Sequence, residues 1–200
     1  MVVLRYDHLV APDLKRPVAP DPYSVLPPVP SFQLTSENFR DGEPLPPAQT
    51  ASGGSVSPQL SWSGFPENTL SFLLTCFDPD APRGGCWHWV VANIPPAVTS
   101  VQAGRSRSPL RVLAGGLVGR TSSIGVDSAI DLPNTLGLTV FMGAAPPKGD
   151  RVHRYFFAVN ALDVAALDLP HGRRTAADLV SATAVPHTLA RAVLMGTCQR

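Results

Sequence analysis

Short apolar runs separated by turn residues are the main pattern of this chain. Five runs have the length and the β-branched and aromatic composition of strands, and they cover residues 57–64, 69–77, 86–94, 138–143 and 153–162. The run 69–77 (TLSFLLTCF) is apolar on both faces, from Leu70 to Phe77, which predicts a central strand buried between two layers. Residues 189–198 could form a last strand.

Helical signals occur only near the end of the chain. Thr175, with Asp178 three residues later, resembles a capping box in the segment TAADLVSATA, and Pro186 would end the helix. The 22 prolines and 16 glycines are spread along the chain, which disfavours a helical bundle. We therefore predict a mostly β protein, an antiparallel β-sandwich with one or two peripheral C-terminal helices.

The first thirty residues differ from the rest in proline content. Seven prolines there predict an extended or disordered arm over residues 1–28, followed by a single domain over residues 29–200. These prolines are Pro12, Pro17, Pro20, Pro22, Pro27, Pro28 and Pro30.

Composition excludes several classes of protein. A formal net charge of +1 with 16% charged residues gives no basic surface for nucleic acid. No apolar run approaches 18 residues, so we expect no transmembrane helix and at most a peripheral membrane contact. Three cysteines (Cys76, Cys86 and Cys198) without a CxxC spacing, and a start that does not resemble a secretory signal, favour a reduced, cytoplasmic location.

Ionisable residues gather at the ends of the predicted strands. Period-two alternation places Asp78 on the face shared by Phe72, Leu74 and Cys76. The same rule places Trp87 and Trp89 on one face and Cys86, His88 and Val90 on the other. His153 opens the last central run, with Tyr155 on its face and Arg154 opposite. Strand ends beside turns are where a sandwich can form the mouth of a pocket.

Taken singly, each of these residues has an ordinary structural explanation. A lone strand histidine is usually a satisfied core or surface group, and tryptophans usually fill a core. Asp80 between prolines suits a turn aspartate, and Arg154 suits pairing with an acid.

Three sequence blocks resemble one family in combination. DPDAP at 78–82, WHWVVANIP at 87–95 and GAAPPKGDRVHRYFF at 143–157 are similar to the signature blocks of the phosphatidylethanolamine-binding protein family, which includes the bacterial Raf kinase inhibitor-like proteins. The resemblance runs from about Pro22 to the C-terminus. It implies a Greek-key type antiparallel β-sandwich whose small cavity takes phosphate, phosphorylethanolamine or similar anions.

The resemblance also assigns residues to that cavity. It implies ligand binding by Asp78, His88, His153, Ala145, Pro146, Pro147 and Tyr155, with Asp80, Pro82, Trp87, Trp89 and Arg154 close to the site. Ala145, Phe141 and Cys198 stand where relatives often have a glycine, a tyrosine and a tyrosine, which makes the pocket less polar.

The chemistry of these residue types fits an anion. A neighbouring carboxylate raises the pKa of a histidine, so His88 or His153 could stay cationic near neutral pH. Backbone amides of the loop 143–150 could then complete the contacts to phosphate oxygens, while Asp78 could instead meet an ammonium group of the ligand. We expect a non-catalytic protein without a cofactor or metal, whose partner is a small phosphorylated ligand or a phospholipid headgroup.

Other functions stay open at this point. Asp78, His88 and His153, with Cys86 as an extra ligand, could form a two-histidine, one-carboxylate metal site, although no HExxH or HxD spacing supports it. A hydrolase has less support, since no GxSxG motif is present. The main alternative is a protein-interaction or inhibitor module that regulates a kinase or protease. An unknown protein partner and a homodimer also remain open.

Overall fold

Two antiparallel sheets form the body of the molecule. The computed structural model describes residues 14–106, 126 and 128–200. The smaller sheet has the order β1-β2-β5 and the larger one the order β6-β4-β3-β7-β8. The strands are β1 (Gln33–Thr35), β2 (Leu60–Ser63), β3 (Ser71–Asp78), β4 (Cys86–Ile94), β5 (Ser100–Val101), β6 (Ile130–Asp131), β7 (His153–Leu162) and β8 (Thr188–Cys198). Within the described residues, α1 (Ala177–Ala184) is the one α-helix, and short 3-10 helices cover Pro47–Gln49, Gly172–Arg174 and Val185–His187.

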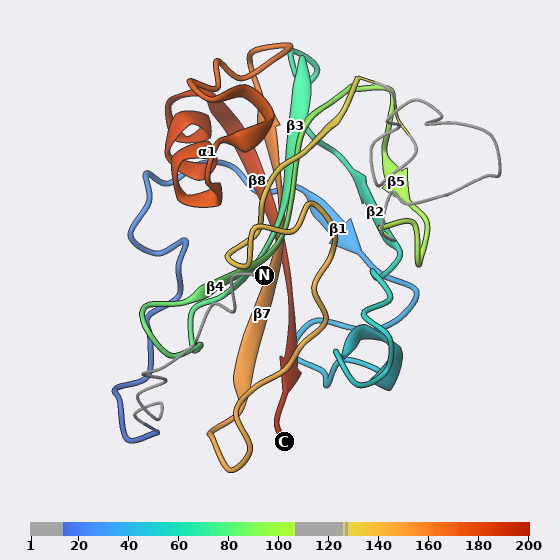
Figure 1. The fold of residues 1–200 in the computed structure, drawn as a ribbon. Helices are drawn as coiled ribbons and strands as arrows, with labels where there is room; N and C mark the ends of the chain where they lie inside the picture. The colour runs from blue at the N-terminus through green and yellow to red at the C-terminus, as the bar shows by residue number, and fades with distance from the viewer. Residues whose placement is uncertain (1–13, 107–125, 127) are drawn as a thin grey trace, which may run out of the picture.

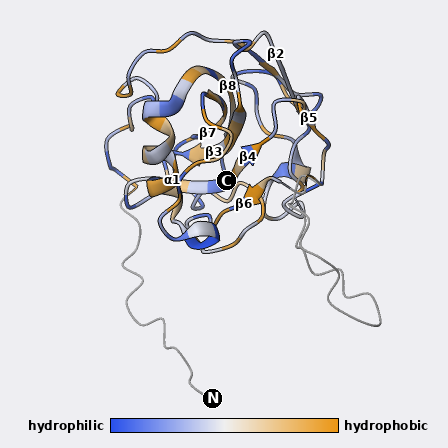
Figure 2. Cartoon of the chain, turned by 90° about the horizontal axis from the view of Figure 1, so that it is seen from above, coloured by the Kyte–Doolittle hydropathy of each residue, from blue (hydrophilic) through white to orange (hydrophobic). Residues whose placement is uncertain are grey.

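The larger sheet lies between the smaller sheet and helix α1 (Figure 1). One core cluster joins the two sheets and includes Trp62, Phe72 and Phe157, whereas a second cluster joins the other face to α1 and includes Leu73 and Val180. Seen from above, hydrophobic and hydrophilic stretches alternate along both strands and loops (Figure 2). The predicted antiparallel β-sandwich with a peripheral C-terminal helix is confirmed. Among the described residues, no helix has the length and apolar character needed to span a membrane.

Strand β3 is buried on both faces because it is central in the middle layer. Every residue from Ser71 to Cys76 is buried, as the apolar run predicted. Leu70 is an exception to that prediction: it precedes the strand and is 50% exposed. Strands β4, β7 and β8 also form where the apolar runs predicted them.

A β-bulge in β4 changes the faces that strict alternation assigns. Cys76 pairs with Trp89 and the next residue, Phe77, pairs with Trp87, so His88 is an extra residue in β4. Trp87 consequently packs against the cluster next to α1, whereas Trp89 lies in the cluster between the sheets. The prediction that both tryptophans share a face opposite His88 was therefore wrong.

Residues 138–143 do not form the predicted strand. Side chains satisfy part of this backbone: Asn134 Oδ1 accepts from the Leu138 N–H, and Ser106 Oγ accepts from the Phe141 N–H at 2.6 Å. The Met142 N–H donates to the His88 carbonyl. Apolar composition alone could not reveal these local partners.

The predicted capping box does not form at the start of α1. The N-cap position is Ala176, without a side-chain cap, because the helix begins one residue later than the motif requires. Thr175 Oγ1 instead donates to the Gly172 carbonyl. Asp178 accepts a hydrogen bond from Trp87 Nε1 at 2.7 Å, which ties the helix to β4.

Residues 14–30 run over the surface of the larger sheet. The Tyr23 ring packs edge-on against Phe156, and the Arg191 guanidinium lies 5.1 Å from the centre of the Tyr23 ring. The Arg191 N–H donates to the Pro30 carbonyl at 2.9 Å. Residues 1–13 of the predicted arm lie outside the described residues.

Candidate functional site

Asp78 and His153 form the centre of the candidate site. Asp78 ends β3 and His153 begins β7, and the His153 Nδ1 atom lies 2.8 Å from Asp78 Oδ2. The other carboxylate oxygen, Oδ1, accepts the N–H of Asp80 at 2.8 Å, so the turn that follows β3 also holds Asp78. Both side chains are almost completely buried, at 1% and 2% exposure.

A second carboxylate contacts the opposite side of the His153 ring. Asp150 Oδ2 lies 3.0 Å from Nε2, so both ring nitrogens face carboxylates and both must carry a proton to donate. Burial alone would lower the pKa of His153, but the hydrogen bonds and charges of Asp78 and Asp150 outweigh it and raise that pKa. The two carboxylates therefore favour the protonated form of His153, which is the effect that the sequence chemistry expected for one of the two histidines.

Arg16 from the N-terminal segment completes this cluster. Its Nη2 atom lies 2.7 Å from Asp150 Oδ2 and 3.2 Å from His153 Nε2, and its Nε donates to the Asp80 carbonyl at 3.1 Å. Burial opposes the charge on Asp150, but the hydrogen bonds from Arg16 and His153 keep its pKa well below the usual range. The sequence analysis named neither Arg16 nor Asp150 as site residues.

Asp80 and Arg154 form a separate ion pair next to the cluster. Arg154 donates from Nε to Asp80 Oδ2 at 2.7 Å and from Nη2 to Oδ1 at 2.8 Å. Burial would raise the pKa of Asp80, but these bonds lower it. The carboxylate of Asp80 is thus used to fix the turn on β7, and Arg154 pairs with an acid.

His88 lies beside this cluster but differs from His153 in charge. Its ring packs edge-on against Tyr155 at 5.1 Å, and its Nδ1 lies 2.7 Å from the Met142 carbonyl, which can only accept. Burial lowers the pKa of His88 despite the Met142 carbonyl and Asp78. His88 is therefore neutral at pH 7, with its proton on Nδ1 and a lone pair on Nε2.

Tyr155 supplies a hydroxyl that stays protonated. Burial, together with the charges of Asp78 and Cys198, raises the pKa of this residue, which is 2% exposed. The hydroxyl can consequently act as a donor at any physiological pH.

The loop that precedes β7 uses much of its backbone inside the protein. The Gly143 N–H donates to Ser55 Oγ and the Ala144 N–H to the Gln49 carbonyl, while Pro146 is buried and Ala145 is exposed. Ala145 is not among the described residues with positive φ, so its backbone suits a residue with a Cβ. Phe141 packs against Trp89 and Phe157.

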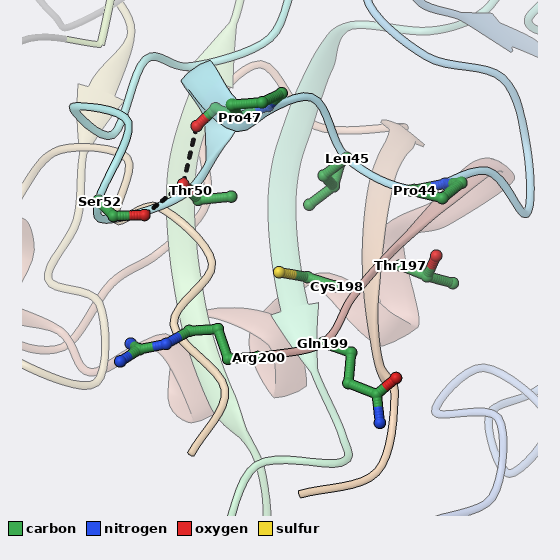
Figure 3. Close-up of a pocket in the computed structure, with 9 residues that line it drawn as sticks. All are labelled: Pro44, Leu45, Pro47, Thr50, Ser52, Thr197, Cys198, Gln199 and Arg200. Carbon is green, nitrogen blue, oxygen red and sulfur yellow. Dashed lines mark hydrogen bonds between the residues drawn. The ribbon is translucent and has the colours of Figure 1, made fainter. Parts of the chain in front are cut away.

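A cavity of about 310 Å³ lies next to the cluster, between the segment 44–52 and the end of β8 (Figure 3). The Cys198 thiol points into this space, and Cys198 pairs with His153 across the β7–β8 ladder. Burial and the charge of Asp78 raise the pKa of this thiol. The lining residues are Pro44, Leu45, Pro47, Thr50, Ser52, Thr197, Cys198, Gln199 and Arg200.

The side chains that could have formed a metal site are arranged differently. In the part of the chain that the structure describes, no three His, Cys, Asp or Glu side chains are grouped as metal ligands. His153 uses both nitrogens on Asp78 and Asp150.

The structure brings together only part of the predicted site. Asp78, His153, His88 and Tyr155 lie close together, and the ladder joins Cys198 to them. Pro82 lies in the turn between β3 and β4. Trp89 packs in the core between the sheets, and Trp87 packs against the core next to α1. Asp150 could have been found from its position three residues before His153, whereas no sequence signal marked Arg16.

The fold agrees with the comparison to known families. The sequence model described as "Phosphatidylethanolamine-binding protein" matches residues 35–199. The chain therefore belongs to the phosphatidylethanolamine-binding protein family, as the signature blocks predicted.

Bacterial relatives support the same assignment. The UPF0098 protein YbcL of Escherichia coli is 44% identical over 140 residues, which cover 66% of this chain and 69% of that protein. YbhB of the same species is 38% identical over 147 residues, covering 70% and 84%. The crystal structure of YbcL, described as a new member of the mammalian family, superposes with a TM-score of 0.73 at 33% identity, covering 85% of this chain and 99% of that one.

Proposed function

We propose that the chain is a non-catalytic binding protein for a small phosphorylated molecule, either a free phosphate ester or a phospholipid headgroup. The observation that carries this proposal is the buried ring of His153, which is held between the carboxylates of Asp78 and Asp150 and is adjacent through the β7–β8 ladder to an open cavity. A fold rarely buries so many charges unless they serve a site, since burying them costs solvation free energy.

The cavity has the size and lining for such a ligand. Its volume of about 310 Å³ suits a molecule as small as a headgroup. Pro44, Leu45 and Pro47 supply an apolar wall, and Arg200 at the opposite end supplies a permanent positive charge. Guanidinium groups bind phosphate oxygens by charge-assisted hydrogen bonds, so Arg200 is the first candidate for the phosphate group.

The cluster beside the cavity contributes groups of a second kind. The Tyr155 hydroxyl is a donor, and the neutral His88 offers a lone pair on Nε2, which can accept a ligand proton. The site thus combines positive charge with acceptors, which suits a ligand that carries both a phosphate and a protonated or hydroxyl-bearing group.

Calorimetric titration with phosphorylethanolamine tests the proposal. We expect Arg200→Gln and His153→Gln to weaken binding about tenfold or more, since each removes a charged group. His171→Gln, a change at an exposed histidine of the 171–174 turn, is the matched control and should bind as the unmodified protein does. Absence of binding by the unmodified protein, or equal binding by all variants, would contradict the proposal. Phosphate release on prolonged incubation would contradict its non-catalytic part.

A further inference from the structure

The carboxylate of Asp78 is already committed inside the protein. One oxygen accepts from His153 Nδ1 and the other from the Asp80 N–H, both at 2.8 Å, and the side chain is 2% exposed. An ammonium group of a ligand therefore has no ready access to Asp78, although the sequence chemistry suggested Asp78 as its partner.

Asp150 and the Asp80 carbonyl bind the guanidinium group of Arg16. Both Asp150 oxygens accept hydrogen bonds from Arg16, Oδ2 at 2.7 Å from Nη2 and Oδ1 at 3.3 Å from Nη1. The Asp80 carbonyl accepts from Arg16 Nε at 3.1 Å and also from Nη2. The cation comes from a distant segment of the same chain, 134 residues before Asp150, and only 17% of its side chain is exposed.

Arg16 supplies one of the positive charges that face the carboxylates of the cluster. The carboxylates of Asp78 and Asp150 face the imidazolium of His153 and the guanidinium of Arg16. Without Arg16, two carboxylates would share one positive partner in a buried environment. This position then attracts another cation strongly, since opposite charges interact most where water is excluded.

The segment that carries Arg16 is held by exchangeable polar contacts. Arg151 donates to the Arg16 carbonyl and Arg154 Nη2 donates to the Ala19 carbonyl at 2.6 Å, while Leu14 and Val18 are exposed. None of residues 14–18 belongs to the two core clusters, and surface segments with few buried apolar contacts open at low free-energy cost.

We propose that Asp150 and the Asp80 carbonyl form a cation subsite that Arg16 fills in the free protein and that the ammonium group of a zwitterionic phosphate ester fills in the complex. This inference rests on the proposed function and narrows it, since it selects ligands that carry an ammonium group as well as a phosphate. Inorganic phosphate cannot replace Arg16, because it has no cation to offer.

Two ligands and one substitution test the exchange. Arg16→Gln frees the subsite, so phosphorylethanolamine should bind about tenfold more tightly than to the unmodified protein, whereas the affinity for inorganic phosphate should not increase. Arg173→Gln, an exposed arginine of the 171–174 turn, is the matched control and should change neither affinity. An equal increase in affinity for both ligands would show that Arg16 only blocks the site sterically. A decrease in affinity for both would show that Arg16 binds the phosphate group. Either result overturns the exchange.

A second measurement follows the arm itself. Phosphorylethanolamine should accelerate trypsin cleavage after Lys15, identified by mass spectrometry, and inorganic phosphate should not. Unchanged cleavage with bound phosphorylethanolamine would overturn the exchange.

Vesicles of phosphatidylcholine, with and without phosphatidylethanolamine, distinguish a lipid headgroup from a free phosphate ester as the ligand. Tighter binding of Arg16→Gln than of the unmodified protein to the mixed vesicles indicates the lipid headgroup. Tighter binding in solution only indicates a free ester. If neither ligand binds either protein, the proposed function fails together with this inference.

Discussion

The Nδ1 atom of His153 lies 2.8 Å from Oδ2 of Asp78, although 75 residues separate the two in sequence. This contact joins the end of β3 to the start of β7, two neighbouring strands of the larger sheet. Because Asp150 contacts the other ring nitrogen, the two carboxylates orient the imidazole and raise its pKa. The stability of the sheet end and the charge of the site therefore depend on the same groups.

Asp78→Asn should destabilise the fold. The amide keeps the size of the side chain but removes the charge that faces a buried imidazolium, and breaking a buried ion pair by changing one partner costs about 3 kcal/mol. Urea unfolding measures the change, with Asp168→Asn on the exposed loop after β7 as the matched control. Equal midpoints for the two variants would show that the Asp78 charge does not stabilise the fold.

Stability should fall as pH rises from neutral because the pKa of His153 is raised in the folded state. A raised pKa means that the folded protein holds this proton more tightly than the unfolded chain does. The resulting stabilisation is complete below the unfolded value of about 6.5 and is lost as pH rises through the folded value. His153→Gln should flatten the decline above about pH 6.5 in denaturant titrations. An unchanged slope would assign the decline to other groups.

Two adjacent glycines in the turn before β4 should respond differently to alanine. Both have positive φ, +93° at Gly84 and +102° at Gly85, so each substitution has the cost of a left-handed residue, about 1 kcal/mol. A Cβ at Gly84 meets nothing within 4 Å, whereas one at Gly85 would lie 2.3 Å from Phe77 Cζ. Gly85→Ala should therefore lower the thermal midpoint clearly more than Gly84→Ala. Equal shifts would indicate that the turn relaxes around Phe77.

Anion affinity should rise as pH falls because His88 is neutral at pH 7 and would gain a proton beside a bound phosphate. Burial lowers the pKa of His88, so the gain appears below the usual value of about 6.5. Glycerophosphorylethanolamine is the suitable probe, since a phosphodiester keeps one negative charge over this range. Affinity at pH 5 should exceed that at pH 7.5, and His88→Gln should remove the difference. A flat profile for the unmodified protein would place the phosphate away from His88.

Much of the fold could be predicted because its signals are local. The run 69–77 predicted a strand buried on both faces. The strands Cys86–Ile94 and His153–Leu162 begin and end where the predicted apolar runs do. The segment 138–143 was assigned wrongly because its backbone partners, Ser106 and Asn134, are side chains from other segments.

The site could be predicted only in part, for a geometric reason. The motifs identified Asp78, His88 and His153, but period-two alternation placed Trp87 and Trp89 on one face because the bulge at His88 leaves no sequence signature. Arg16 reaches Asp150 across 134 residues, and nothing in a proline-rich arm marks one arginine as a partner of a distant carboxylate.

The protonation states of His88 and His153 are the central claim of this account, and imidazole NMR spectra recorded against pH test it most directly. His88→Gln and His153→Gln assign the two signals among the five histidines. We predict that His153 is doubly protonated and His88 neutral at pH 7, and that phosphorylethanolamine shifts both signals. A neutral His153 at pH 7, or two signals that ignore the ligand, would contradict the account.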